Sequence, residues 1–181
     1  SDHQSLIETL AAQAYTVDSA RHFSGSVPIH VSPITLKMRF NPNATSEEPL
    51  VPEGELPPQL DLRQQSLFAA SWTMGSIKYL AESRSTSLTF FETIGRRGIL
   101  PGKQAQERLT ISAKPFYPMY WVFYFLLRKF SKFRKAISSD PLQLEVLAGE
   151  TKDGATIMMI ANFHDRTQKV EVEGIDGEWQ Q

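Results

Sequence analysis

Glu92 is the side chain whose neighbours best suit acid–base chemistry. It follows the apolar run 88–91 (Leu-Thr-Phe-Phe) and precedes 93–95 (Thr-Ile-Gly), so we expect it at the end of a strand. Desolvation at such a position favours a protonated carboxyl group, whereas a nearby arginine favours the ionised form, and either form can serve as a general acid or base. The alternative is that Glu92 only forms ion pairs at the rim of the fold. Its possible partners are Arg39, Arg96 and Arg97.

A second group of polar residues follows another apolar run. Arg39, Asn41 and Asn43 come after residues 27–38 and offer guanidinium and amide groups, which are directional partners for a carboxylate, lactone or sugar oxygen. The alternative is that Arg39 caps the loop and that residues 41–43 form a turn. We predict Glu92 as the catalytic residue. The predicted substrate-binding residues are Arg39, Asn41, Asn43 and Arg96.

Helices and strands that alternate along the chain are expected to position these residues. The predicted elements are a helix over 5–25, a strand over 27–40, a loop over 41–60, a helix over 61–82, a strand over 87–92 and a helix from Pro118 to about 135. Ser5 and Glu8 have the spacing of a capping box. Gly75, inside a predicted helix, indicates close packing of another element. Strands separated by helices indicate parallel βα units, whose reacting groups lie at the C-terminal strand ends.

The pattern changes after Pro141. Apolar residues at 142, 144 and 146 alternate with Gln143 and Glu145, and with the run 157–160 and the valines at 170 and 172 they predict about three antiparallel strands. Two parallel strands cannot close a barrel of roughly eight, and three antiparallel strands cannot form a sandwich. We therefore predict an α/β fold: terminal βα units of a (β/α)8 TIM barrel over 1–138 and the start of an antiparallel β-sandwich domain over 139–181. Both ends look cut, so a missing N-terminal barrel segment is an expected partner.

Composition narrows the classes of function. Lys and Arg total 19 against 20 for Asp and Glu, and a formal net charge of -1 gives no positive field for nucleic acid or an anionic membrane. The longest apolar stretch, 116–127, is shorter than the roughly 20 residues of a membrane span. The chain has no cysteine, and GxSxG, HExxH, P-loop and dinucleotide motifs are absent, so no metal or cofactor is expected. The compartment is not determined, although a cytoplasmic location is favoured.

Three segments resemble a known family. The runs 30–44 (HVSPITLKMRFNPNA), 61–73 (DLRQQSLFAASWT) and 88–95 (LTFFETIG) resemble the C-terminal part of the D-apionate lactonase family and, more loosely, the retaining glycosidases of the large clan with (β/α)8 barrels. The resemblance implies that the two strands are the seventh and eighth of a barrel. It also implies that Pro118 begins the eighth helix and that residues 142–173 belong to the β-domain that commonly follows.

The resemblance to glycosidases has a gap at one decisive position. Retaining glycosidases of that clan place a nucleophilic glutamate at the end of the seventh strand, and use two carboxylates. Residues 37–41 (Lys-Met-Arg-Phe-Asn) contain no carboxylate. Lactone hydrolysis needs only a carboxylate that activates water and groups that stabilise an oxyanion, so it stays compatible with the sequence.

The leading hypothesis is a hydrolase of sugar-derived lactones or glycosides that acts on a small-molecule sugar or sugar lactone. Glu92 would be its acid/base, and the chain alone is expected to be inactive. The rival is a non-catalytic carbohydrate-binding or structural barrel in which Glu92 and its arginines form a network of ion pairs. A concave pocket shared by Glu92, Arg39 and Asn41 would favour the enzyme.

Overall fold

The structure is a computed structural model that describes residues 2–39, 43, 45, 50–52, 55–102 and 116–174. The helices are α1 (His3–Glu8), α2 (Leu10–Ser24), the 3-10 helix η1 (Leu62–Gln65), α3 (Leu67–Glu82) and α5 (Pro118–Lys129). The strands are β1 (His30–Ile34), β2 (Ser87–Phe90), β3 (Glu92–Ile94), β4 (Gly98–Leu100), β5 (Lys132–Arg134), β6 (Leu144–Glu150) and β7 (Thr156–Asn162). No helix among these residues combines the length and apolar character of a membrane span.

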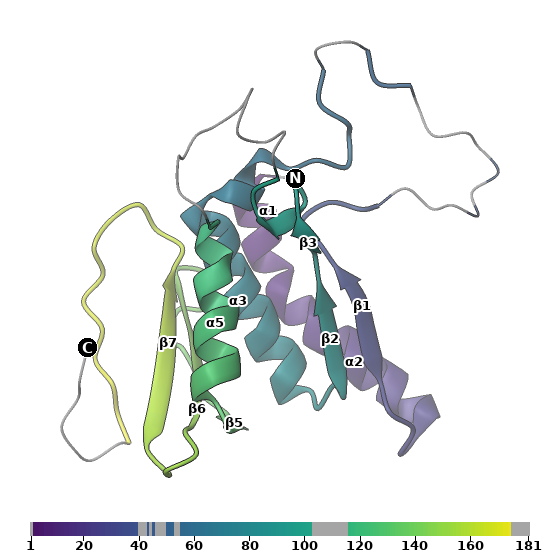
Figure 1. The fold of residues 1–181 in the computed structure, drawn as a ribbon. Coiled ribbons are helices and arrows are strands. Elements are labelled where there is room, and N and C mark those ends of the chain that lie inside the picture. The colour runs from purple at the N-terminus through teal and green to yellow at the C-terminus, as the bar shows by residue number, and fades with distance from the viewer. Residues whose placement is uncertain are drawn as a thin grey trace.

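Three layers make up the described part of the chain (Figure 1). Strands β1 and β2 pair in parallel, as predicted, and lie along one side of the helices. Helices α2, α3 and α5 form the middle, with α3 packed against both of the others. On the other side, β5, β6 and β7 form an antiparallel sheet against α3. The described residues thus form an α/β structure with small sheets and no closed barrel, and they include no second layer of a β-sandwich.

The helix ends show which side chains satisfy the first backbone amides. Asp2, and not Ser5, caps α1, because its carboxylate accepts a hydrogen bond from the Ser5 amide at 2.7 Å. The predicted capping box at Ser5 was therefore wrong. The predicted helix over 5–25 is divided at Thr9 into α1 and α2, and Gly25 ends α2 with a φ of 57°, as expected for a glycine C-cap.

The two parallel strands are shorter than predicted. Strand β1 ends at Ile34 instead of residue 40, and β2 ends at Phe90 instead of residue 92. Phe91 still donates its amide to the Ile34 carbonyl at 3.2 Å, but its φ is 48°, a left-handed conformation that is uncommon for a bulky residue. Because the backbone turns at Phe91, β2 does not continue beside residues 35–39. These residues therefore form no ladder of strand hydrogen bonds with β2.

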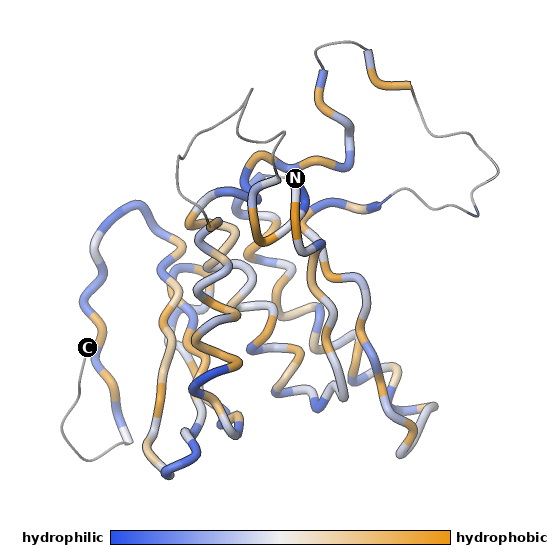
Figure 2. The backbone as a smooth tube through the Cα atoms, viewed as in Figure 1, coloured by the Kyte–Doolittle hydropathy of each residue, from blue (hydrophilic) through white to orange (hydrophobic). Residues whose placement is uncertain are grey.

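Helix α3 is the centre of the core. Ser66 caps it, and ten of its sixteen residues are buried. A Cβ built on Gly75 would lie 2.8 Å from Cδ1 of Leu10 on α2, which confirms the close packing predicted for this glycine. Pro118 begins α5, as predicted, and hydropathy along that helix turns hydrophilic at its C-terminal end (Figure 2). Trp121 of α5 is 47% exposed.

The antiparallel sheet differs from its prediction in two ways. The valines at 170 and 172 form no strand, and the third strand is β5, which pairs with β6 in the register Lys132↔Glu150 to Arg134↔Ala148. Strand β6 also presents the opposite face: Glu145 and Leu147 are buried and Leu144 and Val146 less so. Because side chains alternate along a strand, this shift by one residue exchanges its two faces.

Glu145 faces inward because α3 supplies its partners. Its side chain is 1% exposed, and it accepts hydrogen bonds from the Tyr79 hydroxyl at 2.5 Å and the Val146 amide at 3.0 Å. The ammonium of Lys78 lies 3.5 Å from Glu145 and 3.4 Å from Glu82. Burial, together with the adjoining Glu145, raises the pKa of the Tyr79 hydroxyl, so Tyr79 stays protonated and remains a donor. These contacts attach β6 to α3.

Replacing Lys78 tests how much the buried carboxylate of Glu145 destabilises the fold when no cation lies beside it. Lys78→Met keeps most of the side-chain length and leaves Glu145 without a cation, so we expect a loss of about 3–5 kcal/mol in the free energy of unfolding. Denaturant titration of the full-length protein measures this loss. Adding Glu145→Gln should recover part of it, because glutamine still accepts from Tyr79 without a buried charge. Lys152→Met, at an exposed turn, is the control. Equal effects of Lys78→Met and Lys152→Met would contradict the interpretation.

Candidate functional site

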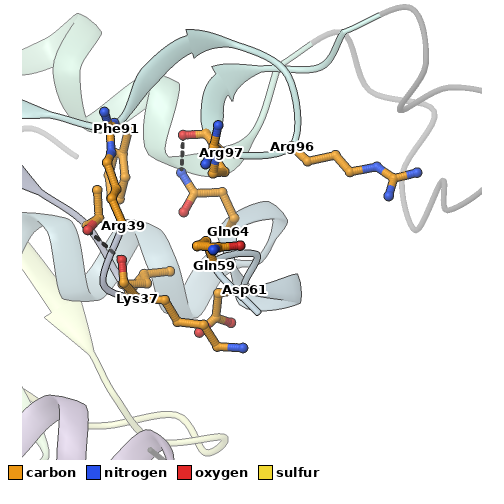
Figure 3. Close-up of a pocket in the computed structure, with 10 residues that line it drawn as sticks. Lys37, Arg39, Gln59, Asp61, Gln64, Phe91, Arg96 and Arg97 are labelled. Atoms are coloured by element: carbon orange, nitrogen blue, oxygen red, sulfur yellow. Dashed lines mark hydrogen bonds between the residues drawn. The ribbon is translucent and has the colours of Figure 1, made fainter. Parts of the chain in front are cut away.

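A small pocket lies where β1 and β2 end. Its lining comes from the residues that follow β1, the segment around η1 and the residues that follow β2 (Figure 3). The lining residues are Thr35, Leu36, Lys37, Arg39, Gln59, Asp61, Gln64, Phe91, Arg96 and Arg97. Because the C-terminal ends of parallel strands are where βα folds place reacting groups, this is the position expected for an active site.

Glu92 lies beside this pocket and contacts two arginines. Its Oε1 atom is 3.0 Å from Nη2 of Arg97 and 4.0 Å from Nη2 of Arg39, and its side chain is 35% exposed. Both guanidinium groups approach the same oxygen. Neither of these ion-pair distances is to the other oxygen, Oε2. Both oxygens of a carboxylate can accept hydrogen bonds, so Oε2 can accept one while Oε1 contacts the arginines.

A tight coil of backbone presents Arg96 and Arg97. It runs from β3 to β4, which pair with Glu92 opposite Gly98 and Ile94 opposite Leu100. A Cβ at Gly98 would lie 2.8 Å from the backbone nitrogen and carbonyl carbon of Ile94, so a larger residue does not fit there. The Arg97 carbonyl accepts from the Glu92 amide at 3.1 Å, which brings the start and end of the coil together.

Positive charge predominates in the pocket. Four of its lining residues are cations, namely Lys37, Arg39, Arg96 and Arg97, and Asp61 is the only described carboxylate among them. Asp61 is engaged by Arg63, which donates from Nε at 2.9 Å and from Nη2 at 2.6 Å. Burial alone would raise the pKa of Asp61, but the hydrogen bonds and charge of Arg63 outweigh burial and hold the pKa below its ordinary value of 3.8. The pocket therefore favours an anionic ligand or an anionic transition state.

Only some of the predicted site residues are found at the pocket in the described part of the chain. Arg39 and Arg96 line the pocket, although the Arg96 side chain extends away from the other labelled residues (Figure 3). Glu92 approaches Arg39 but is not itself among the lining residues. Asn43 is exposed and is not among the lining residues, and Asn41 lies outside the described residues. The pocket thus contains part of the predicted set.

Two residues that contribute most to the geometry had other predicted roles. Arg97 was expected only as a rim partner of Glu92, and Gln64 only as one residue of the predicted helix over 61–82. Gln64 is 4% exposed, and its amide nitrogen lies 3.1 Å from the Gly98 carbonyl, a contact across 34 residues of sequence that local patterns do not reveal. No group of three or more histidine, aspartate or glutamate side chains suited to a metal ion occurs in the described part of the chain.

A comparison with models of protein families shows which family the chain resembles. The model of the D-apionate lactonase TIM-barrel domain matches residues 1–130 of the 181. The chain belongs to this family. Family membership confirms the resemblance recognised in the sequence, and it identifies β1 and β2 with their helices as βα units of a TIM barrel. Comparison with curated protein sequences gave no match.

The Asp61–Arg63 pair should make stability depend on pH. Because the folded-state pKa of Asp61 lies below the unfolded value, its contribution is present above about pH 4 and disappears as the pH falls through the folded-state pKa. Asp61→Asn keeps the N-cap of η1 and removes the charge. We expect it to lose about 1–2 kcal/mol of unfolding free energy at pH 7 and much less at pH 3. Thermal unfolding of both proteins across this range measures the difference, and a gap that is the same at both pH values would contradict it.

Proposed function

We propose that the protein hydrolyses a sugar-derived lactone of the D-apionolactone type, with Glu92 as the base that activates water. The observation that supports this most directly is the position of Glu92: it lies at the strand ends of a lactonase-family barrel, beside a cationic pocket, and its ion pairs with Arg97 and Arg39 are made through Oε1. The proposed ligand is a small-molecule sugar lactone, and no step of the proposed reaction needs a cofactor.

The reaction requires one proton transfer in each direction. Water adds to the lactone carbonyl carbon while Oε2 of Glu92 takes one of its protons. The resulting tetrahedral intermediate bears a negative charge on the former carbonyl oxygen. When the ring C–O bond breaks, the carbonyl forms again and the departing ring oxygen receives the proton from Glu92 to become a hydroxyl group. The product is a hydroxy acid that ionises to a carboxylate, and Glu92 returns to its starting state.

The cations of the pocket are suited to the charge that develops in this sequence. Arg39 and Arg97 already contact Oε1 of Glu92, and Lys37 and Arg96 add positive charge to the lining of the pocket. Guanidinium groups donate directional hydrogen bonds to carboxylates and to oxyanions. Preorganised donors at an oxyanion typically contribute about 10²–10³-fold to the rate. Asn41 and Asn43 remain proposed as contacts to the hydroxyl groups of the sugar.

Glycoside hydrolysis has less support from the same residues. Retaining glycosidases need two carboxylates flanking the scissile bond. Among the described residues at the pocket, the second carboxylate is Asp61, and Arg63 occupies both of its oxygens. The TIM barrel also requires strands beyond β1 and β2, so we propose that a preceding barrel segment completes both the fold and the site. The boundary proposed between the barrel and a β-sandwich domain remains near residue 138.

A second role for Glu92 has a specific observation in its favour. The 3.0 Å ion pair with Arg97 is what a structural network at the barrel rim would contain. An ion pair as exposed as this one contributes only about 0–1 kcal/mol to the free energy of unfolding. A gain in stability is therefore a weak explanation for two arginines on one carboxylate. The two roles predict different results when the charge of Glu92 is removed.

Glu92→Gln tests the proposal, because it preserves shape and removes the proton acceptor. In the full-length protein we expect kcat for D-apionolactone to fall by about 10²–10⁴-fold. The melting temperature should stay within about 2 °C, since the ion pair is half-exposed. Glu171→Gln, an exposed carboxylate in the segment after β7, serves as the matched control. Full activity of Glu92→Gln with a lowered melting temperature would instead assign Glu92 to a structural ion-pair network.

A further inference from the structure

The buried side chain of Gln64 makes hydrogen bonds that have no role in the reaction proposed above. Gln64 lies in η1, directly before α3, and is one of the few polar residues of the core. Its Nε2 donates to the carbonyls of Gly98 at 3.1 Å and Arg97 at 3.3 Å, and lies 3.5 Å from Sδ of Met119 on α5. An amide nitrogen has two hydrogens, which these three acceptors share, and two of the acceptors belong to the coil between β3 and β4.

The Arg97 carbonyl joins Gln64 to Glu92. This oxygen accepts from the Glu92 amide at 3.1 Å as well as from the Gln64 side chain at 3.3 Å. The guanidinium of the same Arg97 lies 3.0 Å from the Glu92 carboxylate. Figure 3 shows Gln64 between Arg97 and Gln59, with its hydrogen bond to the Arg97 backbone. The backbone that supports Arg97 is therefore held from one side by the proposed base and from the other by Gln64.

The coil has few other supports in the described structure. Within it, the Gly98 amide donates to the Gly95 carbonyl at 2.9 Å and the Gly95 amide donates to Leu100 at 2.9 Å. These two bonds are local, and a third, from the Tyr117 amide to the Ile99 carbonyl at 3.4 Å, joins β4 to the N-cap of α5. Gly95 has a φ of 107°, a conformation in which glycine has more freedom than other residues. The amide of Gln64 is the side chain that ties this coil to the segment leading into α3.

We propose that Gln64 is a positioning residue, which sets the place of Arg97 relative to Glu92 by holding the Arg97 and Gly98 carbonyls. This inference rests on the proposed lactone hydrolysis, because Arg97 matters for rate only if Glu92 and the pocket act on a lactone. Gln64 itself does not touch the reacting atoms. Displacing a group by about 1 Å at such a site typically costs about 10²-fold in rate, so loss of this tether acts on kcat more than on KM.

The test combines two replacements in the full-length protein. Gln64→Met keeps the side chain long and apolar enough to fill the space but removes both donors. We expect kcat for D-apionolactone to fall by about 10–100-fold and KM to change by less than about threefold. Arg97→Ala alone should lower kcat, and Gln64→Met added to Arg97→Ala should lower it little further, because there is no arginine left to position. Gln64→Asn, a shorter amide, should recover part of the loss.

The neighbouring residue gives a matched control. Gln65 is in the same 3-10 helix and makes no side-chain hydrogen bond with the described residues. Gln65→Met should leave kcat close to that of the unchanged protein, and its effect should add independently to that of Arg97→Ala. Independent, additive effects of Gln64→Met and Arg97→Ala would overturn the inference, as would unchanged kinetics in Gln64→Met.

A readout without substrate separates this inference from the proposed function. Trypsin cleaves after arginine, and Arg96 and Arg97 both lie in the coil that Gln64 holds. Brief digestion of the folded protein should cut after these arginines at least tenfold faster in Gln64→Met than in Gln65→Met. If the unchanged protein does not hydrolyse D-apionolactone, the proposed function fails, and the cleavage rate still decides whether Gln64 holds the coil. Equal cleavage rates in the two variants would overturn the inference by themselves.

Discussion

The burial of α3 on most of its sides is the constraint on which the remaining structure depends. A helix in this position must be contacted by other elements around its circumference, and it is: α2 and α5 flank it, and β6 and β7 cover a third side. Gly75 permits the approach of α2, and the partners of Glu145 on α3 hold the antiparallel sheet. Interiors packed in this way have low compressibility, so the ends of α3 are fixed points for the loops that leave it.

The site uses one of these fixed points. The 3-10 helix η1 is joined to the N-terminus of α3 through Ser66, which caps α3 and whose hydroxyl donates to the Arg63 carbonyl at 2.7 Å. Gln64 therefore belongs to a rigid part of the molecule, and Met119 of α5 lies against it. The coil after β2 is anchored to that rigid part and not to the strands alone. A loop that presents two arginines thereby acquires a defined position beside Glu92.

The contacts of Glu92 bear on both roles that its sequence allowed. Arg97 and Arg39 approach the carboxylate through Oε1. A carboxylate that accepts a proton at its second oxygen, Oε2, would suit a base that activates water. The same contacts also suit an ion-pair network, and the distinction between these depends on chemistry at Oε2. In either case the net positive charge of the pocket favours an anionic ligand over a cationic one.

The sequence by itself determined the alternation of helices with β1 and β2, the parallel pairing of these strands, the start of α5 at Pro118, the tight packing at Gly75 and the family. These features depend on local periodicity, on the special conformations of proline and glycine, and on motifs. Tertiary structure decided the face that β6 presents, the choice of β5 as its partner and the role of Gln64. Glu145 faces inward because Lys78 and Tyr79, far from it in sequence, neutralise and hydrogen-bond its carboxylate. Gln64 meets the coil 33 and 34 residues later for the same reason: which polar groups find partners in a buried interior depends on contacts between distant segments, which no local pattern of residues specifies.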